Sequence, residues 1–151
     1  MSDALLTEND VCDAVACWLK ERRIQMVEPP RRTNQQGIDI VAKGPDEDWL
    51  VEAKGETSSK PGTARYEKGF DNNQLRIHVA RAFYATAKLR CQHQCPNTRV
   101  AMALPDTGAS RDAVRLIETA LSKLDICILW VGRHHGKKEL SVTPWPEGRF
   151  E

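Results

Sequence analysis

The sequence lacks several features that would place the protein in a specialised class. No run of apolar residues approaches the roughly 20 that a membrane helix needs. The first residues, Met1 to Ala4, lack the basic-then-apolar layout of a secretion signal. No internal repeat and no linker-like stretch divides the 151 residues. We therefore expect one domain over residues 1–151, in the cytoplasm and with no membrane partner.

The chain also has little net charge. Its formal charge of +1 neither requires nor excludes a polyanionic partner, but the distribution is uneven. Between Thr57 and Cys95 there are seven basic residues and two acidic ones. Phosphate binding depends on such local basic surfaces rather than on the total charge. A solvated helix face beside a charged loop would give the same count, and it is the commoner origin of a charge cluster alone.

The five cysteines are an odd number, and in a cytoplasmic protein we expect them to be reduced. Cys91 and Cys95 have His93 between them, and His134 and His135 follow later. This pattern suggests zinc, but a second Cys/His pair with matching spacing is missing. Zinc is therefore the weaker metal hypothesis.

Apolar periodicity and turn residues predict a mixture of helices and strands. Thr7 is the expected N-cap of the first helix, with Asp10 three residues on, and Ser110 is the expected cap of the third. The apolar run over residues 125–131 is typical of a central strand covered on both faces. The expected helices are residues 2–23, 73–92 and 110–123, and the expected strands are residues 24–27, 37–43, 49–54, 98–104, 125–131 and 139–143. This order predicts an α/β fold with a mixed β-sheet flanked by helices.

The predicted hairpin of the second and third strands carries the residues best suited to chemistry. Side chains alternate along a strand, so Glu52 and Lys54 project from the same face. If the hairpin is symmetric about a turn centred between Pro45 and Asp46, Asp39 lies directly opposite Glu52. Opposed residues have Cβ atoms about 4.5–5.5 Å apart. The two carboxylates would then be close enough to share a metal ion.

Two adjacent carboxylates repel each other, and a divalent cation removes that repulsion. Mg²⁺ prefers oxygen ligands and keeps several waters, so two carboxylates and a substrate phosphate suit it. Such an ion polarises the phosphate and lowers the pKa of a bound water. Lys54 would orient that water or stabilise charge on the phosphorus. The pattern fits phosphodiester hydrolysis, whereas a bare Glu-x-Lys motif arises more often from a solvated pair on an exposed hairpin.

The segments GIDIVAK (residues 37–43) and WLVEAKG (residues 49–55) resemble the core of the PD-(D/E)xK, or restriction-endonuclease-like, nuclease superfamily. The order of elements over residues 5–131 is similar too. The resemblance implies a three-layer restriction-endonuclease-like core, with Asp39, Glu52 and the Ala53 carbonyl as metal ligands and Lys54 as the catalytic lysine. Ile38 stands where the family pattern has proline, and glutamate is an accepted second acidic residue.

The motif layout is most similar to the archaeal Holliday-junction resolvase branch, which has an acidic residue near the start of helix one. Glu8 stands at that place and is a catalytic candidate; the alternative is a first-turn glutamate favoured by the helix dipole. Related nucleases often have a glutamine near the start of helix two, as Gln74 is here, although an ordinary helix-start residue is the alternative. Glu56 continues the alternation of Glu52 and Lys54 and is a further candidate.

A long polar loop over residues 55–73 follows the catalytic strand. Its Lys60, Arg65 and Lys68, together with Arg76 beyond it, are expected to contact nucleic-acid phosphates. The resemblance implies a Mg²⁺- or Mn²⁺-dependent DNA endonuclease of repair, recombination or defence, with DNA favoured over RNA and a homodimer able to cut both strands. Two alternatives are a catalytically inactive nuclease fold that binds nucleic acid or protein, and an ordinary α/β domain with an accidental Glu-x-Lys pair.

Overall fold

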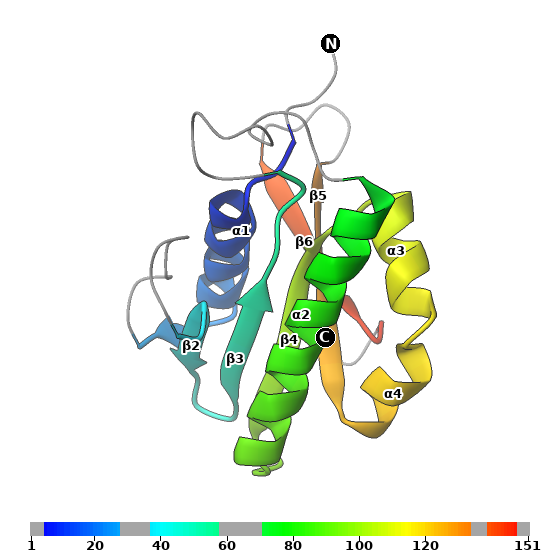
Figure 1. Ribbon diagram of the computed structural model, residues 1–151. Helices are drawn as coiled ribbons and strands as arrows, with labels where there is room; N and C mark the ends of the chain where they lie inside the picture. The colour runs from blue at the N-terminus through cyan, green and yellow to red at the C-terminus, as the bar shows by residue number, and fades with distance from the viewer. Residues whose placement is uncertain (1–4, 28–36, 58–70, 134–138, 148–151) are drawn as a thin grey trace.

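The computed structural model describes residues 5–27, 37–57, 71–133 and 139–147. The described elements follow the predicted order, except that the third helix is divided in two (Figure 1). In chain order they are α1 (Glu8–Glu21), β1 (Gln25–Met26), β2 (Ile40–Lys43), β3 (Asp48–Ala53), α2 (Asn72–Gln92), β4 (Thr98–Pro105), α3 (Gly108–Arg115), α4 (Glu118–Lys123), β5 (Ile126–Arg133) and β6 (Leu140–Trp145).

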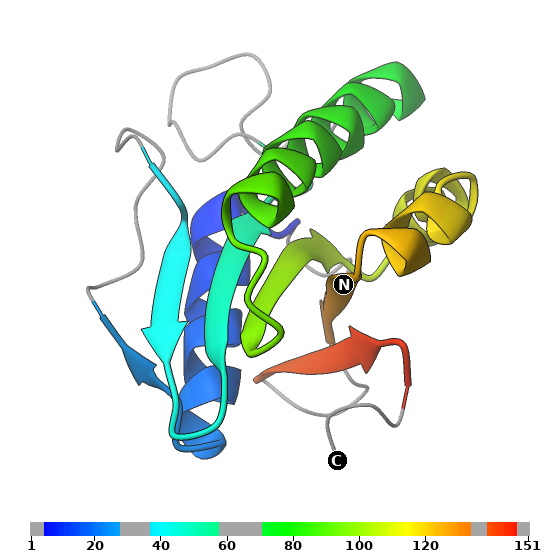
Figure 2. The ribbon, with the colours of Figure 1, turned by 90° about the horizontal axis from the view of Figure 1, so that it is seen from below.

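The strands form one mixed sheet in the order β1-β2-β3-β4-β5-β6. β1, β2 and β3 are antiparallel neighbours, β3, β4 and β5 are parallel, and β6 returns antiparallel to β5. The sheet curls along its length (Figure 2). Every residue from Ile126 to Val131 is buried, so the prediction of a covered central strand is confirmed. The predicted α/β class with a mixed sheet flanked by helices is confirmed as well.

Helices cover both faces of this sheet (Figures 1 and 2). Along β4 the side chains alternate between two cores: Ala101 and Ala103 pack with α1 on one face, and Val100 and Met102 pack with α2 on the other. α3 and α4 contribute Val114 and Leu121 to the α2 side. The result is a helix–sheet–helix arrangement in three layers. Among the described helices, none has both the length and the apolarity needed to cross a bilayer.

The first helix begins later than predicted. Thr7 is the N-cap, and it exchanges two hydrogen bonds with Asp10 at 2.8 and 3.1 Å, which confirms the predicted capping box. The prediction of helix from residue 2 is wrong for residues 5–7. These residues precede the cap, and Thr7 forms a parallel bridge with Thr57. Residues 2–4 lie outside the described part of the chain.

The predicted cap of the third helix is also wrong. Thr107, two residues after the end of β4, accepts a hydrogen bond from the Ser110 amide at 3.1 Å, so the helix starts at Gly108. The backbone at Ile117 (φ −120°, ψ 9°) leaves the α-helical region and separates α3 from α4.

Candidate active site

The hairpin has the predicted symmetry. β2 and β3 pair in the register Ile40–Val51, Val41–Leu50, Ala42–Trp49 and Lys43–Asp48. The turn is therefore centred between residues 45 and 46. Continuing this register by one residue places Asp39 opposite Glu52.

A backbone hydrogen bond fixes the Asp39 carboxylate at the end of β3. The Ala53 amide donates to Asp39 Oδ2 at 2.8 Å, and Asp39 is only 8% exposed. Along β3, Val51 and Ala53 belong to the core beneath α1, whereas Leu50 packs on the α2 side. Because side chains alternate, Glu52 projects on the same side as Leu50, toward α2. The alternation predicted for this strand is thus present.

Lys54 directly follows β3. Its amide donates to the Ala103 carbonyl at 3.0 Å, which continues the pairing with β4 by one residue. The Lys54 Nζ lies 3.9 Å from Glu52 Oε1, and the two side chains are 19% and 17% exposed. An ammonium and a carboxylate therefore lie side by side in a largely buried position.

The segment before α1 packs against the residues that follow β3 and is hydrogen-bonded to them. A Cβ built on Gly55 would lie 2.4 Å from the Glu8 amide nitrogen and 2.6 Å from the Thr7 carbonyl carbon, so only glycine fits. Beyond it, the Glu56 amide donates to the Leu6 carbonyl at 2.7 Å, and the Leu6 amide donates to Glu56 Oε2 at 2.8 Å. Glu56 thus holds the segment before α1, and Glu8 stands beside the strand end as the first residue of the helix.

The carboxyl groups of this region influence one another. Burial, and then the charge of Asp39, raises the pKa of Glu52 to about 7, against the smaller opposing effect of Lys54. Burial also raises the pKa of Glu8, with Lys54 lowering it and Asp39 raising it. Glu8 is therefore both a first-turn residue of α1 and an electrostatic neighbour of the hairpin carboxylates. A cation placed among these groups would relieve their repulsion.

Helix α2 supplies residues that the sequence reasoning missed. Burial lowers the pKa of His78, as do the charges of Lys54 and Arg81, and the charge of Lys88 lowers the pKa of Glu52. Arg81 and Lys88 belong to the seven basic residues between Thr57 and Cys95, but the sequence did not single them out as site residues. The sequence could have pointed to His78, because it lies four residues after the candidate Gln74 and therefore on the same side of a helix.

Gln74 has a structural contact in the first turn of α2. Its Oε1 accepts from the Asp71 amide at 3.0 Å, and its own amide donates to Asp71 Oδ1 at 2.8 Å, which makes a capping box. Arg76 lies on the exposed surface of α2. At 100° per residue it lies about 140° around the helix axis from Arg81, so the two side chains project in different directions. Lys60, Arg65 and Lys68 lie outside the described residues.

The donor set suits a cation that keeps most of its own waters. In the described ranges, no group of three or more His, Cys, Asp or Glu side chains is arranged to hold a metal ion. Asp39, Glu52 and the Ala53 carbonyl would offer oxygen atoms only. Mg²⁺ commonly binds through one or two carboxylates, waters and substrate phosphates, so this donor chemistry fits it.

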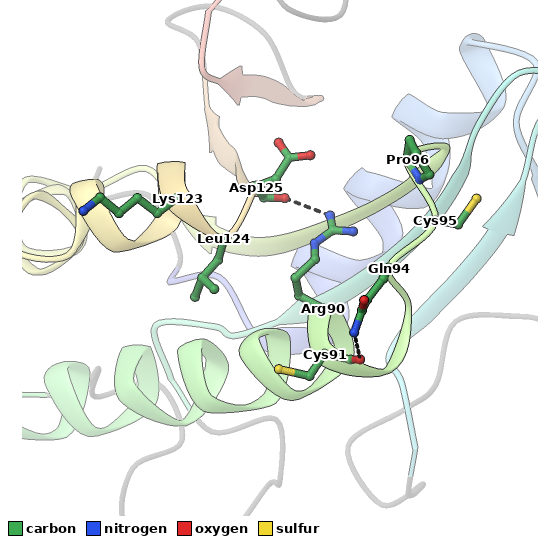
Figure 3. A pocket seen from close by; sticks show the side chains of 8 residues that line it. All are labelled: Arg90, Cys91, Gln94, Cys95, Pro96, Lys123, Leu124 and Asp125. Atoms are coloured by element: carbon green, nitrogen blue, oxygen red, sulfur yellow. Dashed lines mark hydrogen bonds between the residues drawn. The ribbon is translucent and has the colours of Figure 1, made fainter.

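The cysteine pair lies elsewhere, at the far end of α2. Cys91 and Cys95 line an open cavity of about 370 Å³ with their side chains pointing apart, and Arg90 crosses it to donate to the Asp125 carbonyl at 2.8 Å (Figure 3). Within the described residues no metal-binding group includes them. The zinc hypothesis therefore gains no support here, and His134 and His135 lie outside the described residues.

Comparisons of this chain with protein-family models, with curated protein sequences and with solved structures each found no match.

Proposed function

We propose that the protein is a metal-dependent nuclease with a restriction-endonuclease-like fold that hydrolyses phosphodiester bonds in the cytoplasm. DNA is the favoured substrate over RNA, and a homodimer would allow two sites to cut both strands. One observation carries the proposal. Extended by one residue beyond its last pair, Ile40–Val51, the β2–β3 register puts Asp39 opposite Glu52, and Lys54 Nζ lies 3.9 Å from the Glu52 carboxylate.

Each residue has a defined task in this proposal. Asp39, Glu52 and the Ala53 carbonyl would hold Mg²⁺ or Mn²⁺, which when bound supplies polarisation of the phosphate and an acidified water. The Ala53 amide holds the Asp39 carboxylate in place before any ligand arrives. Glu52, with a pKa of about 7, gives up its proton near neutral pH. The Lys54 ammonium donates hydrogen bonds to the attacking water or to a phosphate oxygen.

Plasmid cleavage tests this assignment. The wild-type protein should nick or cut DNA with Mg²⁺ or Mn²⁺ and not with EDTA. Glu52→Gln and Lys54→Ala should each lose at least about 100-fold in rate, because each removes a group that acts on the reacting phosphate. Lys20→Ala and Glu21→Gln, at the exposed end of α1 on the opposite face of the sheet, are the matched controls and should cut normally. Undiminished cleavage by both site variants would refute the assignment.

Metal binding gives a second readout that needs no substrate. Titration with Mn²⁺, followed by the loss of its free-ion paramagnetic resonance signal, should show a site in the wild-type protein. Asp39→Asn and Glu52→Gln should weaken that site, whereas Glu21→Gln should not. Equal Mn²⁺ binding by all four proteins would place the metal elsewhere.

A second candidate is a catalytically inactive nuclease fold that binds nucleic acid or protein. It is favoured by the absence, among the described residues, of any group of three or more side chains able to hold a metal. It predicts no cleavage of any DNA or RNA together with retained DNA binding. The close placement of Asp39, Glu52 and Lys54 argues against it, because an inactive fold has no need to bury three matched polar groups.

A further inference from the structure

The outer side of α2 carries an exposed aromatic ring between cations. Ile77, Arg81, Tyr84 and Lys88 follow one another at steps of four, three and four residues, which places them on one stripe about 16 Å long. Tyr84 is 70% exposed and Ile77 is 50% exposed. Arg81 and Lys88 are exposed too, and Lys88 Nζ lies 5.8 Å from the centre of the Tyr84 ring. The stripe combines apolar, aromatic and cationic groups on one solvent-facing surface.

Folding of the helix does not require this stripe. The side chains by which α2 packs against the sheet are Val79, Ala82, Thr86 and Leu89, on the other side of the helix. Large apolar side chains exposed in one row are the informative exception on a protein surface. A partner that covers Ile77 and Tyr84 would explain their position.

Charge selects the partner. α2 contains Arg76, His78, Arg81, Lys88 and Arg90 and no aspartate or glutamate. A second copy of α2 would bring the same cations against these, so the stripe is unsuited to self-association. A nucleic-acid strand brings phosphates to the cations and a base to the aromatic ring. In a duplex the bases are stacked inside, so only an unpaired strand can use the ring.

The helix that carries the stripe also packs over β3, the strand of Glu52. The charge of Lys88 acts on Glu52, and the charge of Arg81 acts on His78, which in turn is influenced by Lys54. A strand lying along α2 would therefore pass within electrostatic range of the hairpin site.

We propose that the stripe Ile77–Arg81–Tyr84–Lys88 binds single-stranded nucleic acid, with a base stacked on Tyr84 and phosphates held by Arg81 and Lys88. The bound strand would run along the helix that packs over β3, the strand of Glu52. This inference rests on the proposed function, because it names the substrate class of the same site: an unpaired strand rather than a plain duplex.

Fluorescence anisotropy in EDTA tests the stripe without cleavage. The probes are a labelled oligothymidylate of about 12 nucleotides, within the site sizes common for single-strand binding, and a blunt duplex of equal length. The wild-type protein should bind the single strand more tightly. Tyr84→Ala should weaken that binding by about 5- to 100-fold, and Tyr84→Phe should restore it, because stacking needs the ring and not the hydroxyl. Tyr84 is exposed, so circular dichroism should show both variants folded.

Salt dependence tests the cations. Arg81→Ala and Lys88→Ala should each flatten the slope of log K against log salt by about 0.7, the contribution of one phosphate contact on a single strand. Lys20→Ala, which removes one exposed charge from α1 on the opposite face, should leave affinity and slope unchanged.

The outcomes separate this inference from the nuclease proposal. The inference is overturned if Tyr84→Ala binds the single strand as tightly as the wild-type protein does. It is also overturned if the wild-type protein binds the duplex as tightly as the single strand. If cleavage depends on Glu52 but Tyr84→Ala changes neither affinity nor KM, the nuclease proposal holds and the proposal that the stripe binds nucleic acid is refuted. If binding depends on Tyr84 but no DNA or RNA is cleaved, the proposed single-strand binding by the stripe is supported and the nuclease proposal is refuted.

Discussion

Ionised Glu52 should destabilise the folded protein. Burial, followed by the charge of Asp39, raises the pKa of Glu52 from 4.5 to about 7. Between these two pH values the folded state holds a proton that the unfolded state has released, so stability falls as pH rises through this window. A shift of this size corresponds to about 3 kcal/mol once Glu52 is ionised in both states. Its side chain is 17% exposed, so water offsets part of the cost, and we expect about 1–3 kcal/mol.

The substitution Glu52→Gln isolates this cost, because it keeps the shape of the side chain and removes its charge. Without metal, the variant should be more stable than the wild-type protein by about 1–3 kcal/mol at pH 8, and the gain should be nearly absent at pH 4.5. Urea unfolding in EDTA, followed by the fluorescence of the four tryptophans, measures the difference. Glu21→Gln, with its exposed side chain on α1, should change stability little at either pH.

A gain that is equal at both pH values, or larger at pH 4.5, would refute this reasoning. The same unfolding experiment with Mn²⁺ added tests whether Glu52 is a metal ligand. Mn²⁺ at about 100 times its Kd should stabilise the wild-type protein by about 2.7 kcal/mol at pH 8, because it binds only the folded state. The stabilisation should be much smaller in Glu52→Gln. Equal stabilisation of both proteins would show that Glu52 is not a metal ligand.

Three further predictions concern the framework of the site. Gly55→Ala should lower stability by about 1–3 kcal/mol in urea unfolding, because its Cβ would meet backbone atoms at 2.4–2.8 Å, whereas Gly108→Ala, with no atom within 4 Å, should not. Asp39→Asn should bring the pKa of Glu52 down toward 4.5, since it removes a neighbouring negative charge; carbon NMR of the carboxyl should show it, and an unchanged pKa would contradict the pairing. Arg90→Met should cost at least about 2 kcal/mol, because Arg90 donates to three backbone carbonyls at 2.8–3.2 Å, and a neutral result in urea unfolding would contradict that role.

The hairpin was predictable because its determinants are local. A strand has a side-chain period of two, and the short turn fixes the register, so the pairs from Ile40–Val51 to Lys43–Asp48, which lead to Asp39 opposite Glu52 one residue further on, followed from counting alone. The capping box of Thr7 and Asp10 is also local, and it was predicted correctly. The capping box joins residues three positions apart, and the hairpin joins two strands that follow each other directly in the sequence.

The rest of the site depends on tertiary packing that no local pattern encodes. Glu8 reaches the hairpin because the backbone before α1 crosses against Gly55, nearly fifty residues away in sequence. Lys88 acts on Glu52, and Lys54 acts on His78, because α2 packs over β3. The direction in which a helix crosses a sheet is set by side-chain packing on both, which periodicity within either element does not reveal.

Burial distinguishes this arrangement from a solvated Glu-x-Lys pair on an exposed hairpin face. A solvated hairpin face would leave both carboxylates in water with ordinary pKa values. Instead Asp39 is 8% exposed, the Glu52 side chain is 17% exposed, and the pKa of Glu52 rises to about 7. Apolar residues at these positions would avoid that cost. Violations of ordinary folding preferences concentrate where function requires them, so these buried carboxylates are the residues at which to seek the protein's chemistry.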